Sequence, residues 1–587
     1  GNAYNALLNS CRNYWHGSTD SDWAKPENWT ANIVPATGED VEFATNDNNL
    51  TSGNGLGEAV RDLHLDMERL IGSLINLSTK KLVIPTAKFL TVDGNINTGG
   101  NNRILIQAAE NQPNGSLVFA NIPTSEEVLA TVEMWSKAWI GTESEGNDKY
   151  RWQYFGIPVH SIIANPTFAG SAVRIYDEAK QTESLGEGKQ WTSLANTSVL
   201  EKFKGYEITQ PVPKKIFFSG RLVNDNLSTG ELPVTEGSYY KGWHLLSNPY
   251  TAAIKVSDIN FGVGMEKTVY LFTTGSFNDW RNEEYGNHGN LSIWDENSTV
   301  APGQYLAIPQ NLAGFSANTA LIPSMQGFMV GVIPDAANGK TVNFNYSKLG
   351  LKGNSQPQRA NRSKAETNYT YTTVTLTGGG QFDRVWLFTQ AECTPTFDNG
   401  WDGPKITSST SEKLQLSVLG SDDVYQIYAS NSINDVYLDV KPAKENTDHT
   451  LHFHHYGTES TYSKIYLLDN HTGSVTDISA DGTTYNFVTN GGEDSKRFKI
   501  ITVNPNDSDQ EETDITTYIE SHSLFVHNRL PEAGNLYLYS LSGSLIASFP
   551  FAAENITSLP IDFVAGLYLL KIDVGTTQVN KKIVVGN

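Results

Sequence analysis

Three tryptophans near the start of the chain are the first residues whose type and spacing could do chemistry. Trp15, Trp23 and Trp29 are separated by polar turn residues in the run YWHGSTDSDWAKPENW. Exposed indoles can stack on the apolar face of a sugar ring, so this cluster is a candidate glycan-binding surface. Large aromatics near a chain terminus more often seal the end of a core. We therefore favour a buried cap on a solenoid or small hairpin over a sugar platform.

A second candidate is the turn FDNGWDG at residues 397–403. Asp398, Asn399 and Asp402 supply the hard oxygen ligands that calcium prefers, in a turn that contains glycine. The turn lacks the full spacing of an EF-hand loop and its distant glutamate. Ordinary turn formation also accounts for Asp, Asn and Gly at these positions. A structural calcium ion is thus the one cofactor that the residues suggest.

Histidines gather in the run HTLHFHHYG at residues 449–457. On a strand, His452 and His454 would point to one face and could chelate a metal ion. No Cys, Asp or Glu lies between Thr450 and Gly457 to complete a ligand set. The polar face of a strand explains the run equally well.

The sequence contains none of the common catalytic motifs. A nucleophile elbow, an H-E-x-x-H helix, a Walker loop and a dinucleotide-binding glycine fingerprint are all absent. No spacing among the 64 acidic residues singles out a glycosidase carboxylate pair. We therefore predict no catalytic residue and no enzymatic activity.

Charge and composition exclude further classes. The chain carries 42 Lys and Arg against 64 Asp and Glu, a net charge of −22 that repels nucleic acid and anionic lipid. The two cysteines, Cys11 and Cys393, fall in different predicted domains, which leaves neither a disulfide scaffold nor a four-cysteine zinc site. No apolar stretch approaches the roughly 18 residues of a spanning helix. The start lacks a signal peptide, so we expect any export signal to have preceded residue 1.

The elements that must position these residues are predicted to be strands. Apolar residues alternate with a period of two in short runs bounded by turn residues, at 82–92, 103–108, 215–220, 369–378 and 464–469. Two short helical patterns, at 124–135 and 252–259, are interpreted as connectors. Strand-sized runs from about 58 to 120 recur at roughly 12 to 22 residues, as in a β-solenoid, although a sandwich would give the same spacing.

The expected fold is all-β and multidomain. We predict a Trp-rich β-solenoid-like domain, a β-sandwich, a basic linker, a second β-sandwich or jelly roll, an acidic linker and a small Ig-like domain. Their boundaries are 1–122, 123–351, 352–367, 368–504, 505–514 and 515–587.

The final segment resembles the C-terminal sorting domain of the type IX secretion system of Bacteroidetes. The matching features are the YSLSG turn at 539–543, the FVAGLYLLKI segment with Gly566, Tyr568 and Lys571, and the end that begins with Lys581 and Lys582. The resemblance implies export across the outer membrane and recognition by the type IX machinery, with these five residues as the sorting signal.

Upstream segments resemble large surface proteins of the same phylum. They include the Trp-rich opening, GWHLLSNPYTAAI at 242–254, IPSMQGFMVGV at 322–332 and DRVWLFTQ at 383–390. The chain departs from them in having Gly-Trp-His where Gly-Trp-Asn is more usual, and in its final Gly-Asn. The resemblance implies an adhesin-like protein and no particular reaction.

The favoured prediction is an exported adhesion or structural protein, at the cell surface, in the outer membrane or outside the cell. Its β-domain loops would be presented to a host or bacterial surface protein or glycan. The alternative is a glycan-binding protein that uses Trp15, Trp23, Trp29, Trp280 and Trp294. A polysaccharide-degrading enzyme is the third hypothesis.

Overall fold

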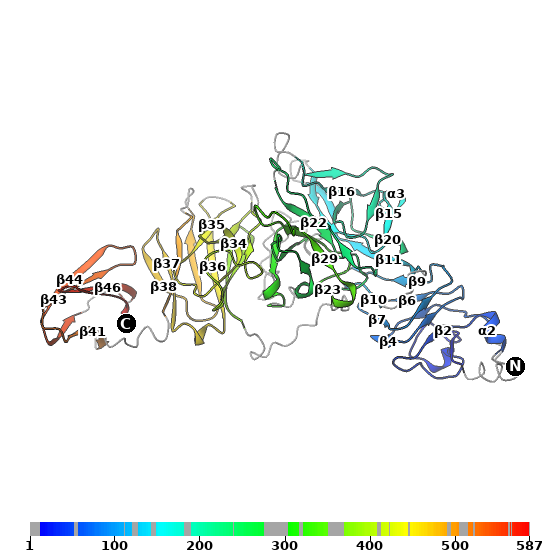
Figure 1. The fold of residues 1–587 in the computed structure, drawn as a ribbon, viewed down its shortest axis with the longest axis horizontal. Coiled ribbons are helices and arrows are strands. Elements are labelled where there is room, and N and C mark those ends of the chain that lie inside the picture. Colours follow the sequence, from blue (N-terminus) through cyan, green and yellow to red (C-terminus); the bar gives the residue numbers. More distant parts are fainter. Residues whose placement is uncertain are drawn as a thin grey trace. The chain divides into compact units, whose positions relative to one another are not determined.

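The computed structural model confirms an all-β, multidomain chain. It describes residues 12–51, 57–110, 112–119, 127–142, 148–180, 190–238, 240–274, 303–315, 321–349, 369–407, 413–421, 423–443, 446–489, 495–503, 515–520, 523–560, 564 and 566–585. Two compact units emerge, the first formed mainly by residues up to 366 and the second mainly by residues from 367. Figure 1 shows that strands are the main secondary structure of both.

Helices in the described residues are short. The α-helices are α2 (Asn46–Thr51) and α3 (Ala164–Thr167), and the 3-10 turns are η1 (Pro26–Asn28), η3 (Val256–Asp258), η4 (Gln310–Leu312), η5 (Tyr346–Lys348) and η6 (Thr458–Ser460). The helical pattern that we predicted at 124–135 is wrong from residue 129 onward, where strand β11 (Leu129–Ser136) begins. Neighbouring strands pair with β11 on both sides, and this pairing overrides the local preference for helix.

The predicted solenoid is confirmed in the form of three parallel sheets. One contains β1 (Tyr14–Trp15), β2 (Val41–Phe43), β5 (Leu74–Ile75) and β8 (Ile96–Asn97), and another contains β4 (Arg69–Ile71), β7 (Phe89–Val92) and β10 (Ser116–Phe119). The third contains β3 (Leu63–His64), β6 (Leu82–Ile84), β9 (Ile104–Ile106) and β11, with β20 (Lys214–Arg221) added antiparallel. Each turn of the chain thus adds one short strand to each face (Figure 1).

Aliphatic side chains stack in register inside the solenoid. Leu63, Leu82 and Ile104 are aligned on successive strands, followed by Ala130, and all four are fully buried. Burial of one such Leu or Ile side chain contributes about 1.5–3 kcal/mol. Each turn of the solenoid can bury its apolar face only against the next turn. This stacking explains why the sequence of this region is rich in short β-strand patterns.

Beyond the solenoid, the first unit contains two larger sheets. One has the order β14 (Gln153–Phe155), β19 (Tyr206–Thr209), β16 (Ala172–Tyr176) and β17 (Trp191–Ser193), and the other has the order β22 (Trp243–Ser247), β28 (Gly327–Gly331), β25 (Thr268–Phe272) and β26 (Tyr305–Pro309). The smaller pairings are β12 (Trp139–Thr142) with β13 (Asp148–Arg151), β15 (Ser161–Ile163) with β18 (Val199–Glu201), β23 (Ile254–Lys255) with β27 (Leu321–Ile322), and β21 (Leu227–Ser228) with β29 (Val342–Phe344) and β24 (Asn260–Phe261).

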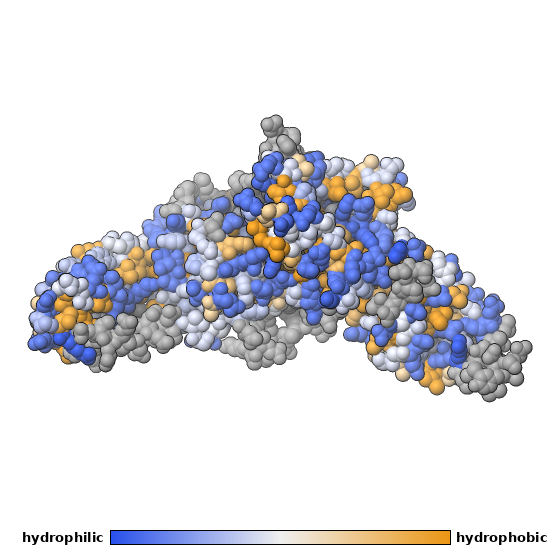
Figure 2. Space-filling view, viewed as in Figure 1, coloured by the Kyte–Doolittle hydropathy of each residue, from blue (hydrophilic) through white to orange (hydrophobic). Residues whose placement is uncertain are grey.

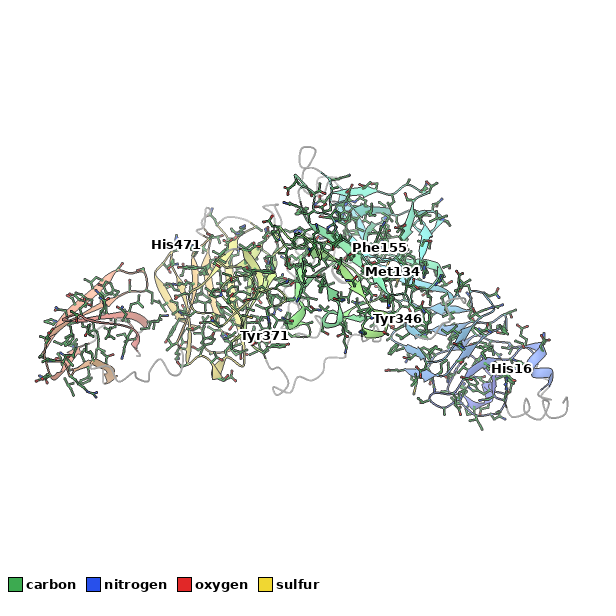
Figure 3. All side chains as sticks on the ribbon, viewed as in Figure 1. His16, Met134, Phe155, Tyr346, Tyr371 and His471 are labelled. Atoms are coloured by element: carbon green, nitrogen blue, oxygen red, sulfur yellow. The ribbon has the colours of Figure 1, made fainter. Side chains whose placement is uncertain are left out.

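One hydrophobic core runs from the solenoid into the sheet β14-β19-β16-β17. It includes Trp15 at one end and Met134 and Phe155 farther along, the latter two labelled in Figure 3. Hydrogen bonds join the parts as well, because the Leu117 N–H donates to the Thr251 carbonyl at 3.1 Å and the Thr251 hydroxyl donates back at 2.7 Å. The predicted boundary at residue 122 lies outside the described residues and stays a prediction.

The segment GWHLLSNPY, noted in the sequence, forms a buried polar centre in this unit. The Asn248 amide is fully buried and donates to the carbonyls of Ala252, Ile322 and Pro323 at 2.9–3.1 Å, while its oxygen accepts the Tyr250 N–H at 3.0 Å. Asn248 thereby satisfies backbone groups of two loops that are distant in the sequence. The GWHLLSNPY segment therefore has a structural role in this unit.

The second unit begins with one sheet of eleven strands. Its order is β38 (Ser474–Asp477), β37 (Lys464–Asp469), β40 (Phe498–Val503), β35 (Val436–Lys441), β33 (Gln415–Leu419), β34 (Val424–Ser430), β31 (Gln381–Thr389), β30 (Thr370–Gly378), β36 (Asp448–Tyr456) and β39 (Thr484–Val488), with β32 (Gly403–Pro404) on β34. The sheet nearly closes on itself. The Ser474 hydroxyl of one edge strand lies 3.1 Å from the Tyr485 hydroxyl of the other.

A small sandwich completes the second unit. One sheet has the order β41 (Ile515–Glu520), β42 (Ser523–Asn528) and β45 (Asn555–Pro560), and the other has the order β44 (Leu545–Phe551), β43 (Gly534–Tyr539), β46 (Gly566–Val574) and β47 (Thr577–Val585). It has a hydrophobic core of its own. The basic linker predicted at 352–367 and the acidic linker predicted at 505–514 lie outside the described residues.

The seam of the eleven-stranded sheet contains the Asp469 cluster, which we define as Asp469, Ser474, Tyr485 and Arg497. The Asp469 carboxylate is buried and accepts Arg497 Nε at 3.0 Å, Arg497 Nη2 at 2.9 Å and the Tyr485 hydroxyl at 2.9 Å. Burial alone would raise the pKa of Asp469, but the hydrogen bonds from Arg497 and Tyr485 outweigh it and lower that pKa below its ordinary value.

This lowered pKa predicts a loss of stability in acid. A carboxyl whose pKa is lower in the folded state stabilises the fold above its unfolded pKa, which is about 3.9, and loses that contribution as pH falls through the folded pKa. We expect wild type to exceed Asp469→Asn in stability at neutral pH, by a margin that shrinks below about pH 4. Urea unfolding between pH 3 and 7 measures this, and a margin independent of pH would contradict it.

Candidate functional site

The three tryptophans of the sequence analysis form the cap of the solenoid. Trp15, Trp23 and Trp29 are 0–1% exposed, with the Trp29 ring edge-on to the other two at centroid distances of 5.3 and 5.6 Å. Trp15 Nε1 donates to the Arg61 carbonyl at 2.9 Å, and the Arg69 guanidinium lies 5.0 Å from the Trp23 ring. The burial of all three rings supports the interpretation of this cluster as a cap. No face of these indoles is open to a sugar. Trp280 and Trp294, which the sequence analysis also considered, lie outside the described residues.

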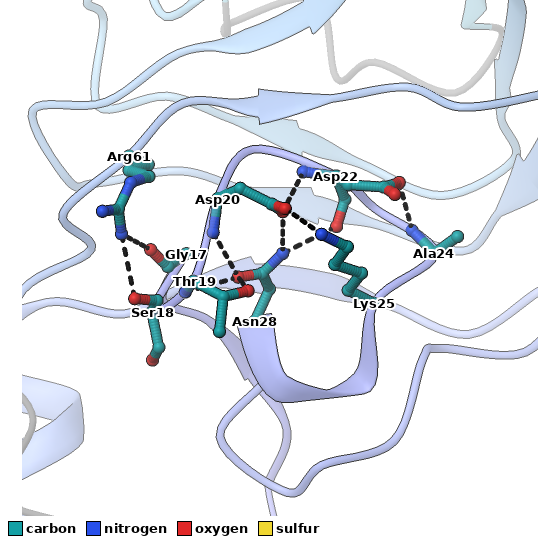
Figure 4. Close-up of polar contacts among 9 residues, drawn as sticks. All are labelled: Gly17, Ser18, Thr19, Asp20, Asp22, Ala24, Lys25, Asn28 and Arg61. Carbon is teal, nitrogen blue, oxygen red and sulfur yellow. Dashed lines mark hydrogen bonds and ion pairs between the residues drawn. The ribbon is translucent and has the colours of Figure 1, made fainter.

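Asn28 orders the loop that links these tryptophans (Figure 4). Its buried side-chain oxygen accepts the N–H groups of Thr19 and Asp20, and its amide donates to an Asp20 carboxylate oxygen at 2.8 Å and to the Asp22 carbonyl at 2.9 Å. Lys25 pairs with the same Asp20 carboxylate and, together with the Asp22 N–H and Asn28, lowers its pKa to about 2. These polar side chains therefore stabilise the loop between the tryptophans.

The predicted calcium ligands are engaged in turn hydrogen bonds. Asp398 accepts the Thr394 N–H at 2.5 Å, and the buried Asp402 carboxylate accepts the N–H groups of Asp398 and Ala429, both at 2.7 Å. Asn399 is grouped with the first unit, while Asp398 and Asp402 belong to the second. Calcium at this turn stays a prediction. Within the described part of the chain, no three His, Cys, Asp or Glu side chains gather as a metal site would need.

Cys393 is a buried free thiol near this turn. Burial, followed by the negative charges of Asp398, Asp402 and Glu392, raises its pKa to about 12. A thiol with so high a pKa is a poor nucleophile at neutral pH. Cys11 lies outside the described residues.

The histidines of β36 each have a different partner. His452 Nε2 lies 3.1 Å from the Thr377 hydroxyl, and His454 Nδ1 lies 3.3 Å from an Asp481 carboxylate oxygen. Burial, followed by the charges of His454 and Arg384, lowers the pKa of His452. The pair forms no common ligand set with a third described His, Cys, Asp or Glu.

The five residues of the predicted sorting signal lie on one hairpin. Gly566, Tyr568 and Lys571 are on β46, and Lys581 and Lys582 are on β47, opposite Leu570 and Leu569. The Tyr568 hydroxyl donates to the Val564 carbonyl at 2.6 Å, which ties the start of β46 to the preceding residue segment. Lys571 lies 3.0 Å from Asp573. The fold therefore brings together residues separated by the turn between the two strands.

Sequence reasoning missed a set of aromatic and charged side chains on the sheet β14-β19-β16-β17. We call it the aromatic face, and define it as Trp152, Tyr154, Arg174, Tyr176, Trp191 and Glu207. Tyr154 and Arg174 pair with Glu207 across the sheet, and Tyr176 pairs with Trp191, so these five project on one side. The sequence signal that could have found this face is the alternation Trp-x-Tyr at 152–154 and Arg-x-Tyr at 174–176, because alternate residues of a strand project on the same side.

An ion pair lies at the centre of the aromatic face. Arg174 bonds to Glu207, whose side chain is 2% exposed, and the Arg174 guanidinium sits 3.7 Å from the centroid of the Trp152 ring. Burial raises the pKa of Glu207 to about 8, against the opposing charge and hydrogen bond of Arg174. The pairing fixes the guanidinium in place.

Three comparisons relate the chain to known proteins. A family model described as "Domain of unknown function (DUF8693)" matches residues 14–501. The chain is 31% identical to the minor fimbrium subunit Mfa5 of Porphyromonas gingivalis over 617 aligned residues, which cover 100% of this chain and 47% of that protein. The chain thus spans about half the length of this curated relative.

A crystal structure of dimeric latent PorU from Porphyromonas gingivalis also matches, with 12% identity over 63% of this chain and 35% of that chain. Its TM-score of 0.10 is too low to support an inference about the fold. Among the described residues, no helix is both long enough and apolar enough to cross a membrane.

Proposed function

The chain belongs to the DUF8693 family, and from this premise we propose that it is part of an exported fimbrial or adhesin-like surface protein without catalytic activity. The observation that carries the proposal is the similarity of its whole length to a minor fimbrium subunit. In this role, the β-modules form a scaffold whose loops meet a host or bacterial surface protein or glycan.

Residues 515–587 act, in this proposal, as the type IX sorting domain. Its support is the sequence resemblance of the segment, together with the separate core of the small sandwich and the gathering of all five signal residues on β46 and β47. A domain with its own core can be recognised as a unit.

Surface location is tested by immunogold labelling of native-host cells with antibodies against residues 12–503. We expect label outside the outer membrane and in sheared fimbrial fractions. Label confined to the periplasm or cytoplasm would contradict the proposal. Cells that lack the gene provide the control for antibody specificity.

The sorting role is tested by deleting residues 515–587 in the native host. We expect the truncated protein to accumulate in the periplasm, and the triple variant Lys571→Ala, Lys581→Ala, Lys582→Ala to be retained in part. Gln578→Ala, an exposed change on the same hairpin outside the predicted signal, is the matched control and should be exported normally. Surface display that survives the deletion would refute the sorting assignment.

A further inference from the structure

We propose that His160 acts as an acid-sensitive latch in the first unit, and that uptake of a proton by its ring releases Lys202 from Asp225 and loosens the two-stranded sheet β15-β18. We define the His160 latch as His160, Lys202, Arg221 and Asp225, whose side chains lie within ion-pair distance of one another. The latch is a conformational device of the fold, and it does not depend on export or adhesion.

Backbone pairing places the members of the latch together. His160 directly precedes β15, and its N–H donates to the carbonyl of Arg221, the last residue of β20, at 3.0 Å. The His160 carbonyl accepts the N–H of Lys202, which follows β18, at 3.1 Å. Asp225 lies in the loop between β20 and β21. Three strand ends and one loop therefore meet at the imidazole ring.

The partners of the ring fix where its proton lies. Lys202 Nζ is 3.2 Å from His160 Nδ1, and an ammonium group can only donate, so Nδ1 must be the acceptor. The ring proton is then on Nε2, which lies 3.2 Å from an Asp225 carboxylate oxygen. Lys202 pairs with the same oxygen. A second proton on the ring would go to Nδ1 and would place two donors, both positively charged, against each other.

The charges of the latch balance only while the ring is neutral. The cations are Lys202 and Arg221, and the anions are Asp225, which lies 3.9 Å from Arg221, and Glu127, which lies 3.8 Å from Arg221. A proton on His160 adds a positive charge that these two anions do not balance. The charge count and the ring geometry thus favour the same neutral state.

The pKa of His160 agrees with this geometry. Burial, followed by the charge of Lys202, lowers this pKa below its ordinary value, although the negative charge of Asp225 opposes the change. Glu201 and Lys204, the charged residues that flank Lys202 in the chain, pair with each other at 2.6 Å.

The sheet β15-β18 has little else to hold it on its outer side. Leu200 of β18 is fully buried in the core, but the cross-strand pair Ile163 and Val199 is 54% and 56% exposed. Figure 2 shows apolar surface at this corner of the first unit, near α3 and β15. Elements with few buried contacts open at a low cost in free energy. The attachment of this sheet therefore depends strongly on the latch at its end.

The loop that contains Asp225 connects the latch to other parts of the first unit. The Asp225 carbonyl accepts the Tyr250 hydroxyl at 2.8 Å, and the Asn226 side-chain oxygen accepts the Tyr346 N–H at 3.0 Å. The Tyr346 hydroxyl in turn accepts the N–H of Phe119 in the solenoid at 3.2 Å. Opening of the latch should therefore also loosen this loop.

The lowered pKa sets the pH at which the latch opens. A histidine whose pKa is lower in the folded state stabilises the fold above its unfolded pKa, which is about 6.5, and this contribution is lost as pH falls through the folded pKa. The latch is thus closed at neutral pH and opens in mild acid. This window lies above the one expected for the Asp469 cluster.

The test is hydrogen exchange of the purified full chain at about pH 7.5 and about pH 5.5, expressed as protection factors so that the intrinsic effect of pH is removed. We expect residues 159–163 and 198–202 to lose protection at the lower pH, while the solenoid rung at Leu82 keeps it. His160→Gln keeps a donor and an acceptor but cannot titrate, and should remove this pH dependence. Lys202→Met removes the opposing cation and should raise the pKa of His160, measured by NMR of ¹³C-histidine.

His64→Gln is the matched control, because His64 is an exposed histidine on β3 of the solenoid, outside the latch. It should keep the pH dependence of wild type. The wild-type NMR titration of His160 decides the matter if His160→Gln fails to fold. The proposal is overturned if wild type is equally protected at both pH values, if His160 titrates at or above its ordinary pKa, or if a folded His160→Gln variant keeps the pH dependence.

Discussion

Replacing Trp15 with alanine is expected to destabilise the solenoid end of the first unit by about 3–5 kcal/mol, the usual cost of truncating a buried Trp or Phe. The indole is fully buried, packs edge-on against Trp29 and donates a hydrogen bond to the Arg61 carbonyl. Its loss leaves a cavity and an unpaired carbonyl at the end of the stack, where no further turn of the solenoid can compensate.

Hydrogen exchange of residues 14–43 and thermal unfolding of the full chain measure this effect. Exchange should accelerate in the cap before it accelerates in the rungs around Leu82 and Ile104. Phe217→Ala, at a side chain that is 52% exposed, is the control and should change stability by no more than about 0.5 kcal/mol. If Trp15→Ala were equally mild, the cap interpretation would be wrong.

Replacing Arg497 with alanine is expected to cost about 3–5 kcal/mol in the second unit, because it leaves the buried Asp469 carboxylate without its counter-charge. The side chains of Arg497 and Asp469 are 6% and 0% exposed, so water cannot replace the lost partner. Arg497 Nη1 also donates to the Val488 carbonyl at 3.0 Å, and this bond reaches the edge strand β39. The variant should therefore loosen the seam between β38 and β39.

The matched control is Lys464→Ala on β37 of the same sheet. Lys464 pairs with Asp477 at 2.6 Å, but the two side chains are 45% and 42% exposed. Solvent-exposed pairs contribute about 0–1 kcal/mol, so this variant should be nearly neutral. Urea unfolding compares the two variants, and equal losses would show that burial of the Asp469 cluster does not set its contribution.

The sequence by itself determined the strands and how they recur. Alternating apolar residues and Gly, Asn or Asp turns are local signals, and they sufficed for the all-β class, for the solenoid rungs that contain Leu63, Leu82 and Ile104, and for the final hairpin with Tyr568 and Lys581. These features depend on neighbours in the chain. The segment at 129–136 shows the limit, because its helical pattern yielded to pairing on both sides.

Only the tertiary structure decided which side chains are exposed and which of them meet. Burial of Trp15, Trp23 and Trp29 follows from their place at the open end of a stack, which spacing alone could not distinguish from a sugar platform. The aromatic face unites Trp152, Arg174, Trp191 and Glu207 through antiparallel pairing of strands that are far apart in the sequence. Exposure and proximity depend on packing between distant segments, and a local pattern carries no information about such packing.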